Sequence, residues 1–237
     1  MFFAALGLGA VATILFLVAR VRKGGILGLF TKTLASIFFI LTAVFACINR
    51  GVFATYSYGI FIIVGLVFGM LGDIWLDLKW IYPQDNNSYT FAGMACFGVG
   101  HLFFMYGICS LSGLISCNIW YFIAPVLAGI FFGVATVGLE KLMKLEYGKF
   151  KAISAVYGAI LATMTCLSFS AYVSSNFTSS IWLVMTIGGV FFIVSDLVLS
   201  GMYFDKNRSK NTPINVVINH STYYMAQYVI ASSIMFF

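Results

Sequence analysis

The sequence predicts an all-α polytopic membrane protein with eight transmembrane helices, on three observations. The chain is 62% hydrophobic and only 8% charged, whereas soluble domains average about a quarter charged residues. Apolar runs of about 20 residues, long enough to cross a bilayer, recur along the chain. The charges lie in short clusters between these runs, and no gap could hold a soluble domain. We therefore expect residues 1–237 to form a single integral membrane domain, with a net charge of +6 that belongs to its loops and implies no nucleic acid.

The apolar runs follow one another with short polar breaks. The first lacks the basic start and the small-residue cleavage site of a signal peptide, so we expect it to remain as a helix. The third carries no charge from Phe53 to Leu71. Turn-rich segments precede the fourth run, at residues 83–88, and the eighth run, at residues 207–213. The expected helices span residues 2–19, 25–48, 53–78, 91–111, 118–139, 152–173, 180–203 and 214–236.

Basic residues mark one side of the expected bundle. They follow the first, third, fifth and seventh runs, at Arg20, Arg22, Lys23, Lys79, Lys141, Lys144, Lys149, Lys151, Lys206, Arg208 and Lys210. The opposite side holds only Arg50. Because basic loops remain in the cytoplasm, we expect a multi-pass protein of the bacterial cell membrane, with these four loops cytoplasmic and both termini outside.

Three carboxylates lie inside the apolar runs. Asp73 and Asp77 are one turn apart on one face of the third helix. Asp196 has the same place in the seventh helix, and Asp73 and Asp196 both begin a D-x-x-L motif, which suggests a four-plus-four internal repeat. Carboxylates are costly in lipid, so these three are candidates for a functional site.

Other polar side chains fall at a similar depth. Counting along each helix places Lys32 about two turns and His101 about three turns from the cytoplasmic end. The eighth helix adds Tyr223, Tyr224 and Gln227. Unpaired polar groups are costly in lipid, so we expect these side chains to face one another around a wet cavity open to the cytoplasm.

Simpler roles remain open for each of these side chains. Lys32 can snorkel to the interface, and Asp77 can pair with Lys79 or Lys32. His101 can be a packing histidine, and the two tyrosines can be core aromatics. For the carboxylates of Asp73 and Asp196, the simpler role is a structural pairing with Lys32.

Several other chemistries lack their sequence patterns. The chain contains no H-E-x-x-H, no C-x-x-C and no G-x-S-x-G. Its five cysteines are irregularly spaced in or beside apolar runs, where we expect them to pack. We therefore expect no metal and no cofactor. Two carboxyl groups in unequal environments remain, and such a pair can act as general acid and base.

Four motifs in order carry a family resemblance. They are Gly72-Asp73, Gly100-His101, Ser195-Asp196 and the Y-Y-x-A-Q motif Tyr223-Tyr224-Met225-Ala226-Gln227. Together with the chain length and the eight runs, they resemble the YhhN, or lysoplasmalogenase-like, membrane family. The chain departs from the family pattern at Phe104, where many members have tyrosine, and at Thr33, where many have proline.

The resemblance implies hydrolysis of the vinyl-ether bond of lysoplasmalogen, with Asp73 and Asp196 as the catalytic pair. The products would be a fatty aldehyde and a glycerophospho-alcohol. Protonation of the enol-ether carbon followed by attack of water is chemistry that two carboxyl groups can perform. We expect Asp196 to be the acid, because its neighbours Val194 and Leu197 are apolar.

The expected partners are membrane lipids and a lysophospholipid substrate. A single-chain lipid can enter sideways with its chain among the helices. Its phosphate would then lie near the cytoplasmic cations, where Lys32 is the candidate within the site.

Two other functions use similar residues. A secondary transporter also places Asp, Lys and His within the membrane, although the runs show no pair of helices broken by Gly or Pro. An intramembrane aspartyl protease needs G-x-G-D, and here Met70 stands in place of the first glycine.

Overall fold

Helices account for nearly all of the described chain. The computed structural model describes residues 1–51, 57–138, 140–207 and 209–237, and no strand occurs in these ranges. The helices are α1 (Phe2–Arg22), α2 (Gly25–Arg50), α3 (Ser57–Ile81), α4 (Asn86–Ser112), α5 (Leu114–Cys117), α6 (Trp120–Gly138), α7 (Lys151–Ser174), α8 (Ser180–Phe204) and α9 (Pro213–Ser232). Short 3-10 turns lie at Pro83–Asp85, Gly148–Phe150 and Ser233–Phe236.

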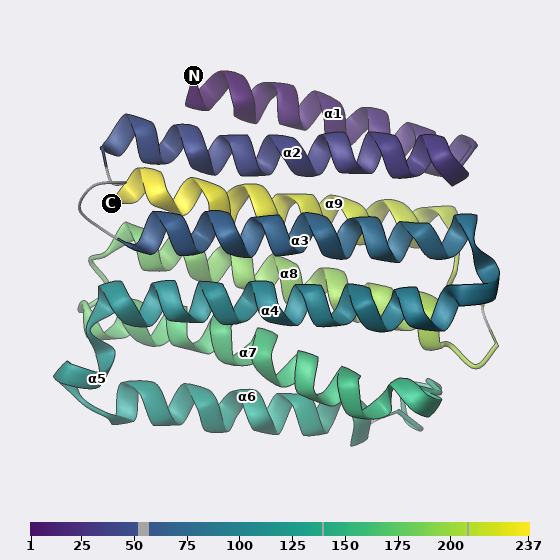
Figure 1. Cartoon of the computed structure of the whole chain (residues 1–237). Helices are drawn as coiled ribbons and strands as arrows, with labels where there is room; N and C mark the ends of the chain where they lie inside the picture. The colour runs from purple at the N-terminus through teal and green to yellow at the C-terminus, as the bar shows by residue number, and fades with distance from the viewer. Residues whose placement is uncertain (52–56, 139, 208) are drawn as a thin grey trace.

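The helix lengths confirm the all-α polytopic class. Within the described residues, seven helices are long and apolar enough to span a membrane, namely α1 to α4, α6, α7 and α8. The less apolar α9 carries Asn215, Asn219 and His220, yet it lies inside the bundle beside α3 and α8 (Figure 1). It therefore completes the expected set of eight.

Most helix ends fall close to their expected positions. The clear exception is α4, which begins at Asn86 instead of residue 91, because the 3-10 turn Pro83–Asp85 leads directly into it. The expected start of the third helix at residues 53–56, the end of the fifth at residue 139, and Arg208 lie outside the described residues.

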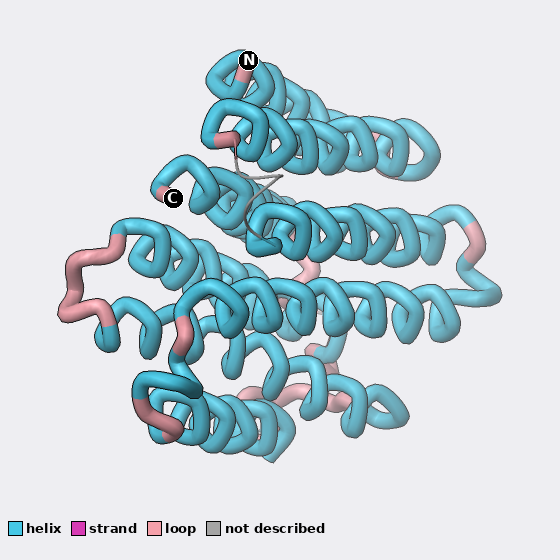
Figure 2. Tube along the Cα trace, turned by 60° about the vertical axis from the view of Figure 1, so that its left-hand side comes forward, coloured by secondary structure: helices cyan, strands magenta, loops and turns pink. Residues whose placement is uncertain are grey.

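Four sequential hairpins build the bundle. They are α1–α2, α3–α4, α6–α7 and α8–α9, and the two halves meet where α4 packs on α7 and α2 on α9. The four basic turns share one end, and both termini lie at the other end (Figure 1). Figure 2 shows the same bundle turned, with loops confined to its two ends.

The two halves have matching neighbours. In each half, consecutive long helices pack together. If α1 to α4 correspond to α6 to α9 in order, the contact of α4 with α7 corresponds to the contact of α9 with α2. Asp73 lies eight residues before Ile81 at the end of α3, and Asp196 lies eight residues before Phe204 at the end of α8. These relations agree with a four-plus-four repeat, which stays a prediction until the halves are superposed.

Backbone hydrogen bonds join two of the basic turns. The Glu146 N–H donates to the Phe204 carbonyl at 2.7 Å, and the Lys206 N–H donates to the Lys144 carbonyl at 3.2 Å. Asp205 accepts hydrogen bonds from the Ser209 hydroxyl and N–H. The hydroxyl bond, followed by the backbone bonds, lowers the pKa of the Asp205 carboxyl. Residues 144–146 of the α6–α7 turn and 204–206 of the α8–α9 turn are therefore held side by side.

Candidate active site

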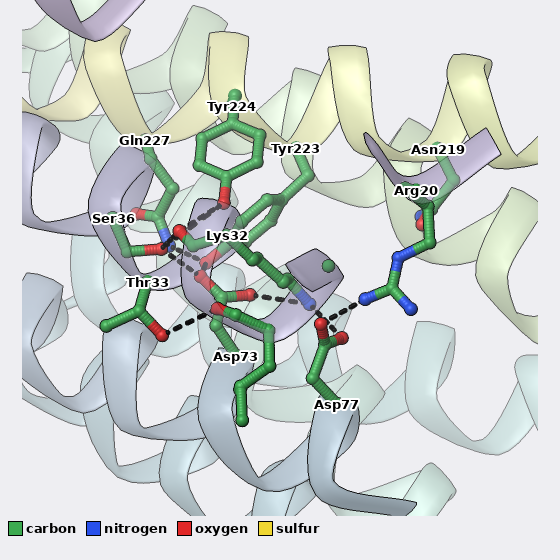
Figure 3. A network of polar contacts seen from close by, with 12 residues as sticks. Arg20, Lys32, Thr33, Ser36, Asp73, Asp77, Asn219, Tyr223, Tyr224 and Gln227 are labelled. Carbon is green, nitrogen blue, oxygen red and sulfur yellow. Dashed lines mark hydrogen bonds and ion pairs between the residues drawn. The ribbon is translucent and has the colours of Figure 1, made fainter. Parts of the chain in front are cut away.

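Asp73 is the centre of a buried polar network (Figure 3). One carboxylate oxygen lies 3.1 Å from the Lys32 ammonium. The other accepts hydrogen bonds from the Ser36 and Tyr223 hydroxyls, both at 2.7 Å. A side chain at Gly72 would place Cβ 2.7 Å from the Phe97 ring, so this glycine lets α4 approach α3 beside the carboxylate. Three donors from α2 and α9 therefore converge on Asp73.

Lys32 bridges two carboxylates. Its ammonium lies 3.2 Å from Asp77 as well as 3.1 Å from Asp73, and the residue is 3% exposed. Asp77 also pairs with Arg20 of α1. Lys32 therefore stays inside the protein and does not snorkel. Asp77 pairs with Lys32 and not with Lys79, whose ammonium lies over the ring of Tyr203.

The Tyr-Tyr-Met-Ala-Gln motif of α9 holds this network together. Tyr223 donates to Asp73, and the Gln227 amide donates to the Tyr223 hydroxyl at 3.0 Å. The Tyr224 hydroxyl donates to the Lys32 backbone carbonyl at 3.0 Å. The motif thus connects α9 to α2 and α3, and it fixes the hydroxyl that faces Asp73.

Asp196 lies in different surroundings on α8. The Tyr157 hydroxyl of α7 donates to one of its oxygens. No described side chain donates a hydrogen bond to the other oxygen. The preceding Ser195 and Asn219 of α9 exchange hydrogen bonds of 2.9–3.1 Å, which fix α8 against α9 at this level.

One cavity of about 690 Å³ brings both aspartates together. Asp73, Lys32 and Tyr223 line it, as do Asp196 and Tyr157. Most of the remaining lining is apolar and comes from α6, α7 and α8, including Phe131, Phe132, Leu161, Val190, Val194 and Leu197. We expected a wet cavity, and its water content stays a prediction. The polar groups form a small part of a mostly apolar lining.

His101 is buried behind two residues of the cavity lining and does not line the cavity itself. Its ring packs edge-on against Phe104 and Phe192 and lies near Tyr157. Neither ring nitrogen has a hydrogen-bond partner among the described residues. His101 does not join the polar groups around Asp73. Its partnerless nitrogens do not fit a satisfied packing histidine, so its role stays a prediction.

Three residues of the site did not stand out in the sequence. Ser36 and Tyr157 are hydroxyl residues within apolar helices, where such residues commonly bond to their own backbone. Arg20 was expected only as a loop charge. For Ser36, the i+4 spacing from Lys32 on one helix face was an available signal. For Tyr157, the contact depends on which helices become neighbours.

Within the described ranges, we find no group of three or more His, Cys, Asp or Glu side chains that could hold a metal ion. The expectation of a reaction without metal or cofactor stays a prediction.

Comparison with known families decides the relationship of this chain. The model of the YhhN family matches residues 27–234. The chain belongs to the YhhN family. The match runs from the start of α2 to the end of α9, so it includes Lys32, Asp73, Asp196 and Tyr223 but not Arg20. The comparisons with curated proteins and with solved structures each gave no match.

Proposed function

We propose that this YhhN family member hydrolyses the vinyl-ether bond of lysoplasmalogen-type lysophospholipids. The products are a fatty aldehyde and a glycerophospho-alcohol. The observation that supports this most is the placement of Asp73 and Asp196 on one apolar cavity, with unequal polar surroundings. A pair of carboxyl groups with different environments is what acid and base roles require.

Asp196 is the general acid in this proposal. Only Tyr157 donates to it among the described side chains, and its second oxygen is free to carry a proton beside the apolar lining. Asp73 is the carboxylate, because a lysine and two hydroxyls stabilise its ionised form. Tyr157 and Tyr223 are positioning residues for the two acids.

The reaction needs one proton transfer to carbon and one water molecule. Asp196 gives its proton to the vinyl carbon remote from the ether oxygen, which leaves an oxocarbenium ion. The Asp73 carboxylate stabilises this cation and takes a proton from the attacking water, which forms a hemiacetal. Collapse of the hemiacetal breaks the carbon–oxygen bond to glycerol, and the proton held by Asp73 returns through solvent to Asp196.

The apolar part of the cavity suits the hydrocarbon chain. Among the helices, α6 packs on α5 and α7. The space between α6 and α8 is therefore bounded on one side by α7. Phe131 of α6 is 69% exposed, and Leu197 of α8 is 49% exposed, although both line the cavity. A lipid chain can therefore enter from the membrane between these two helices.

Purified protein incubated with a vinyl-ether lysophospholipid and with its saturated-ether analogue tests the proposal. We expect aldehyde from the first lipid and no product from the second, because only the vinyl carbon can accept the proton. If the vinyl-ether lipid releases no aldehyde and the protein carries solute into liposomes, the protein is a transporter and the proposed hydrolysis is wrong.

A further inference from the structure

A second cavity lies at the basic end of the bundle. It has a volume of about 400 Å³. Its walls come from the α1–α2 turn, the end of α3, the end of α8 and the start of α9, and we call it the polar chamber. The polar chamber is lined by Arg20, Val21, Lys23, Gly24, Gly25, Asp77, Trp80, Leu199, Met202, Tyr203, Asn211, Thr212, Pro213, Val216, Asn219 and His220.

The polar chamber adjoins the apolar cavity. Leu199, Tyr203, Asn219 and His220 line both spaces. Asp77 of the polar chamber and Asp73 of the apolar cavity are one helical turn apart, about 6 Å along α3. The two spaces therefore share a wall next to Asp73.

Two helix N-termini face the polar chamber. Gly24 precedes α2, which begins at Gly25, and Thr212 precedes α9, where its hydroxyl accepts a hydrogen bond from the Asn215 N–H. The first turn of α2 contains no acid, and no side chain caps it. Helix N-termini carry free N–H groups and a positive partial charge, so they favour a bound anion.

Arg20 adds a cation to the wall of the polar chamber. One of its guanidinium nitrogens pairs with Asp77. The Nε is fully buried and faces no open space, so a bound anion would contact the terminal part of the guanidinium.

The charges around the polar chamber leave a positive surplus. Arg20 and Lys32 balance the carboxylates of Asp73 and Asp77. Lys23 lines the polar chamber, and no described carboxylate lies within ion-pair distance of it. An anion of one charge would neutralise this surplus.

We propose that the polar chamber binds the phosphate ester of the lipid head group, with Arg20, Lys23 and the start of α2 as its donors. This inference rests on the proposed function for the rest of the lipid. Only the glycerol carbons separate the phosphate of a lysoplasmalogen from its vinyl ether, so the reactive bond would reach the junction beside Asp73. Lys32 is held between two carboxylates and leaves the phosphate to Arg20 and Lys23.

Binding of a saturated-ether lysophospholipid to the full-length protein in detergent tests the proposal without any turnover. Lys23→Glu should weaken binding about tenfold, since it replaces a charge-assisted contact by repulsion. Arg22→Glu is the matched control, because Arg22 lies in the same turn, is exposed and does not line the polar chamber. Equal affinity of both variants and wild type would overturn the proposal.

Two further probes identify the source of the phosphate. A monoalkyl glycerol without phosphate should bind wild type and Lys23→Glu equally. Inorganic phosphate should compete with the lysophospholipid in wild type and less in Lys23→Glu. If inorganic phosphate binds with Lys23-dependent affinity but the lysophospholipid does not, the chamber takes a free phosphate compound and the head-group assignment is wrong.

The test of the head-group site can fail independently of the test of hydrolysis. If Lys23→Glu weakens lipid binding but the vinyl-ether lipid releases no aldehyde, the head-group site stands and the proposed reaction fails. If aldehyde is released with the same KM by wild type, Lys23→Glu and Arg22→Glu, the reaction stands and the head-group site fails.

Discussion

Asp73 and Asp196 show at the scale of single residues how one sequence pattern acquires two environments. Both follow a small residue near the basic end of an apolar helix. The structure gives Asp73 a lysine and two hydroxyls, and it gives Asp196 a single tyrosine hydroxyl. Their difference therefore comes from the neighbouring helices and not from the motif.

Substitution of either aspartate by asparagine should stop the reaction. We expect Asp73→Asn and Asp196→Asn each to lower turnover about 10²–10⁴-fold, because each removes one proton-transfer group. Aldehyde release measures turnover, and thermal unfolding checks that the fold remains. Asp85→Asn, which changes an exposed turn carboxylate, should keep the wild-type rate. Near wild-type turnover in either site variant would count against the pair.

Lys32 carries a stability prediction of its own. Lys32→Met should destabilise the protein by about 3–5 kcal/mol, because the buried Asp73 carboxylate loses its ammonium partner. Removal of both charges in Lys32→Met/Asp73→Asn should recover most of that loss. Thermal unfolding in detergent measures both variants. A double variant no more stable than Lys32→Met would show that the ion pair is not what stabilises this region.

Helix α6 stands out at the scale of elements, because it forms one wall of the apolar cavity and packs mainly on α7. Gly129 and Gly133 make this close contact possible. A Cβ at Gly129 would lie 2.8 Å from the Ala159 carbonyl, and a Cβ at Gly133 would lie 2.8 Å from the Ala159 nitrogen. Small residues allow such close approach of membrane helices.

A larger side chain at this contact should therefore push α6 away from α7 and displace the wall of the apolar cavity. Gly133→Val should lower the thermal stability and raise the KM for the vinyl-ether lipid, since α6 moves away from α7. Gly138→Val introduces the same side chain at the end of the same helix, where a Cβ would meet no atom of another element within 4 Å, and should behave as wild type. A wild-type KM in Gly133→Val would mean that the substrate chain does not lie against α6.

The sequence predicts the elements better than their contacts. Length and polarity were sufficient for eight helices, because lipid imposes both on any spanning segment. The same rules could not distinguish Asp196, which lines the cavity, from His101, which does not. Ser36 and Tyr157 were missed because a hydroxyl in an apolar helix acquires its meaning from the helix packed beside it.

The whole molecule has two unlike ends. All four basic turns lie at one end, and both termini and α5 lie at the other (Figure 1). Because basic loops remain in the cytoplasm, we infer that the polar chamber opens to the cytoplasm and that α5 lies outside. Products would then separate, with the glycerophospho-alcohol leaving through the polar chamber and the aldehyde remaining in the membrane.

Cysteine labelling in intact cells tests this orientation. Cys117 of α5 is exposed, whereas the other four cysteines are buried or partly buried. We expect a membrane-impermeant maleimide to label wild type at Cys117. The double variant Cys117→Ser/Lys149→Cys should react with the maleimide only after the cells are permeabilised, because residue 149 is exposed at the basic end. The reverse labelling pattern would show that the protein has the opposite orientation in the membrane.

Hydrolysis in D₂O tests the central claim most directly, because the mechanism requires a solvent-derived proton on carbon. Wild-type protein should convert the vinyl-ether lysophospholipid into an aldehyde with one deuterium on the carbon next to the carbonyl, and Asp196→Asn should form almost none. Mass spectrometry of the trapped aldehyde gives both results. An aldehyde without deuterium, or one formed at the wild-type rate by Asp196→Asn, would contradict protonation by Asp196.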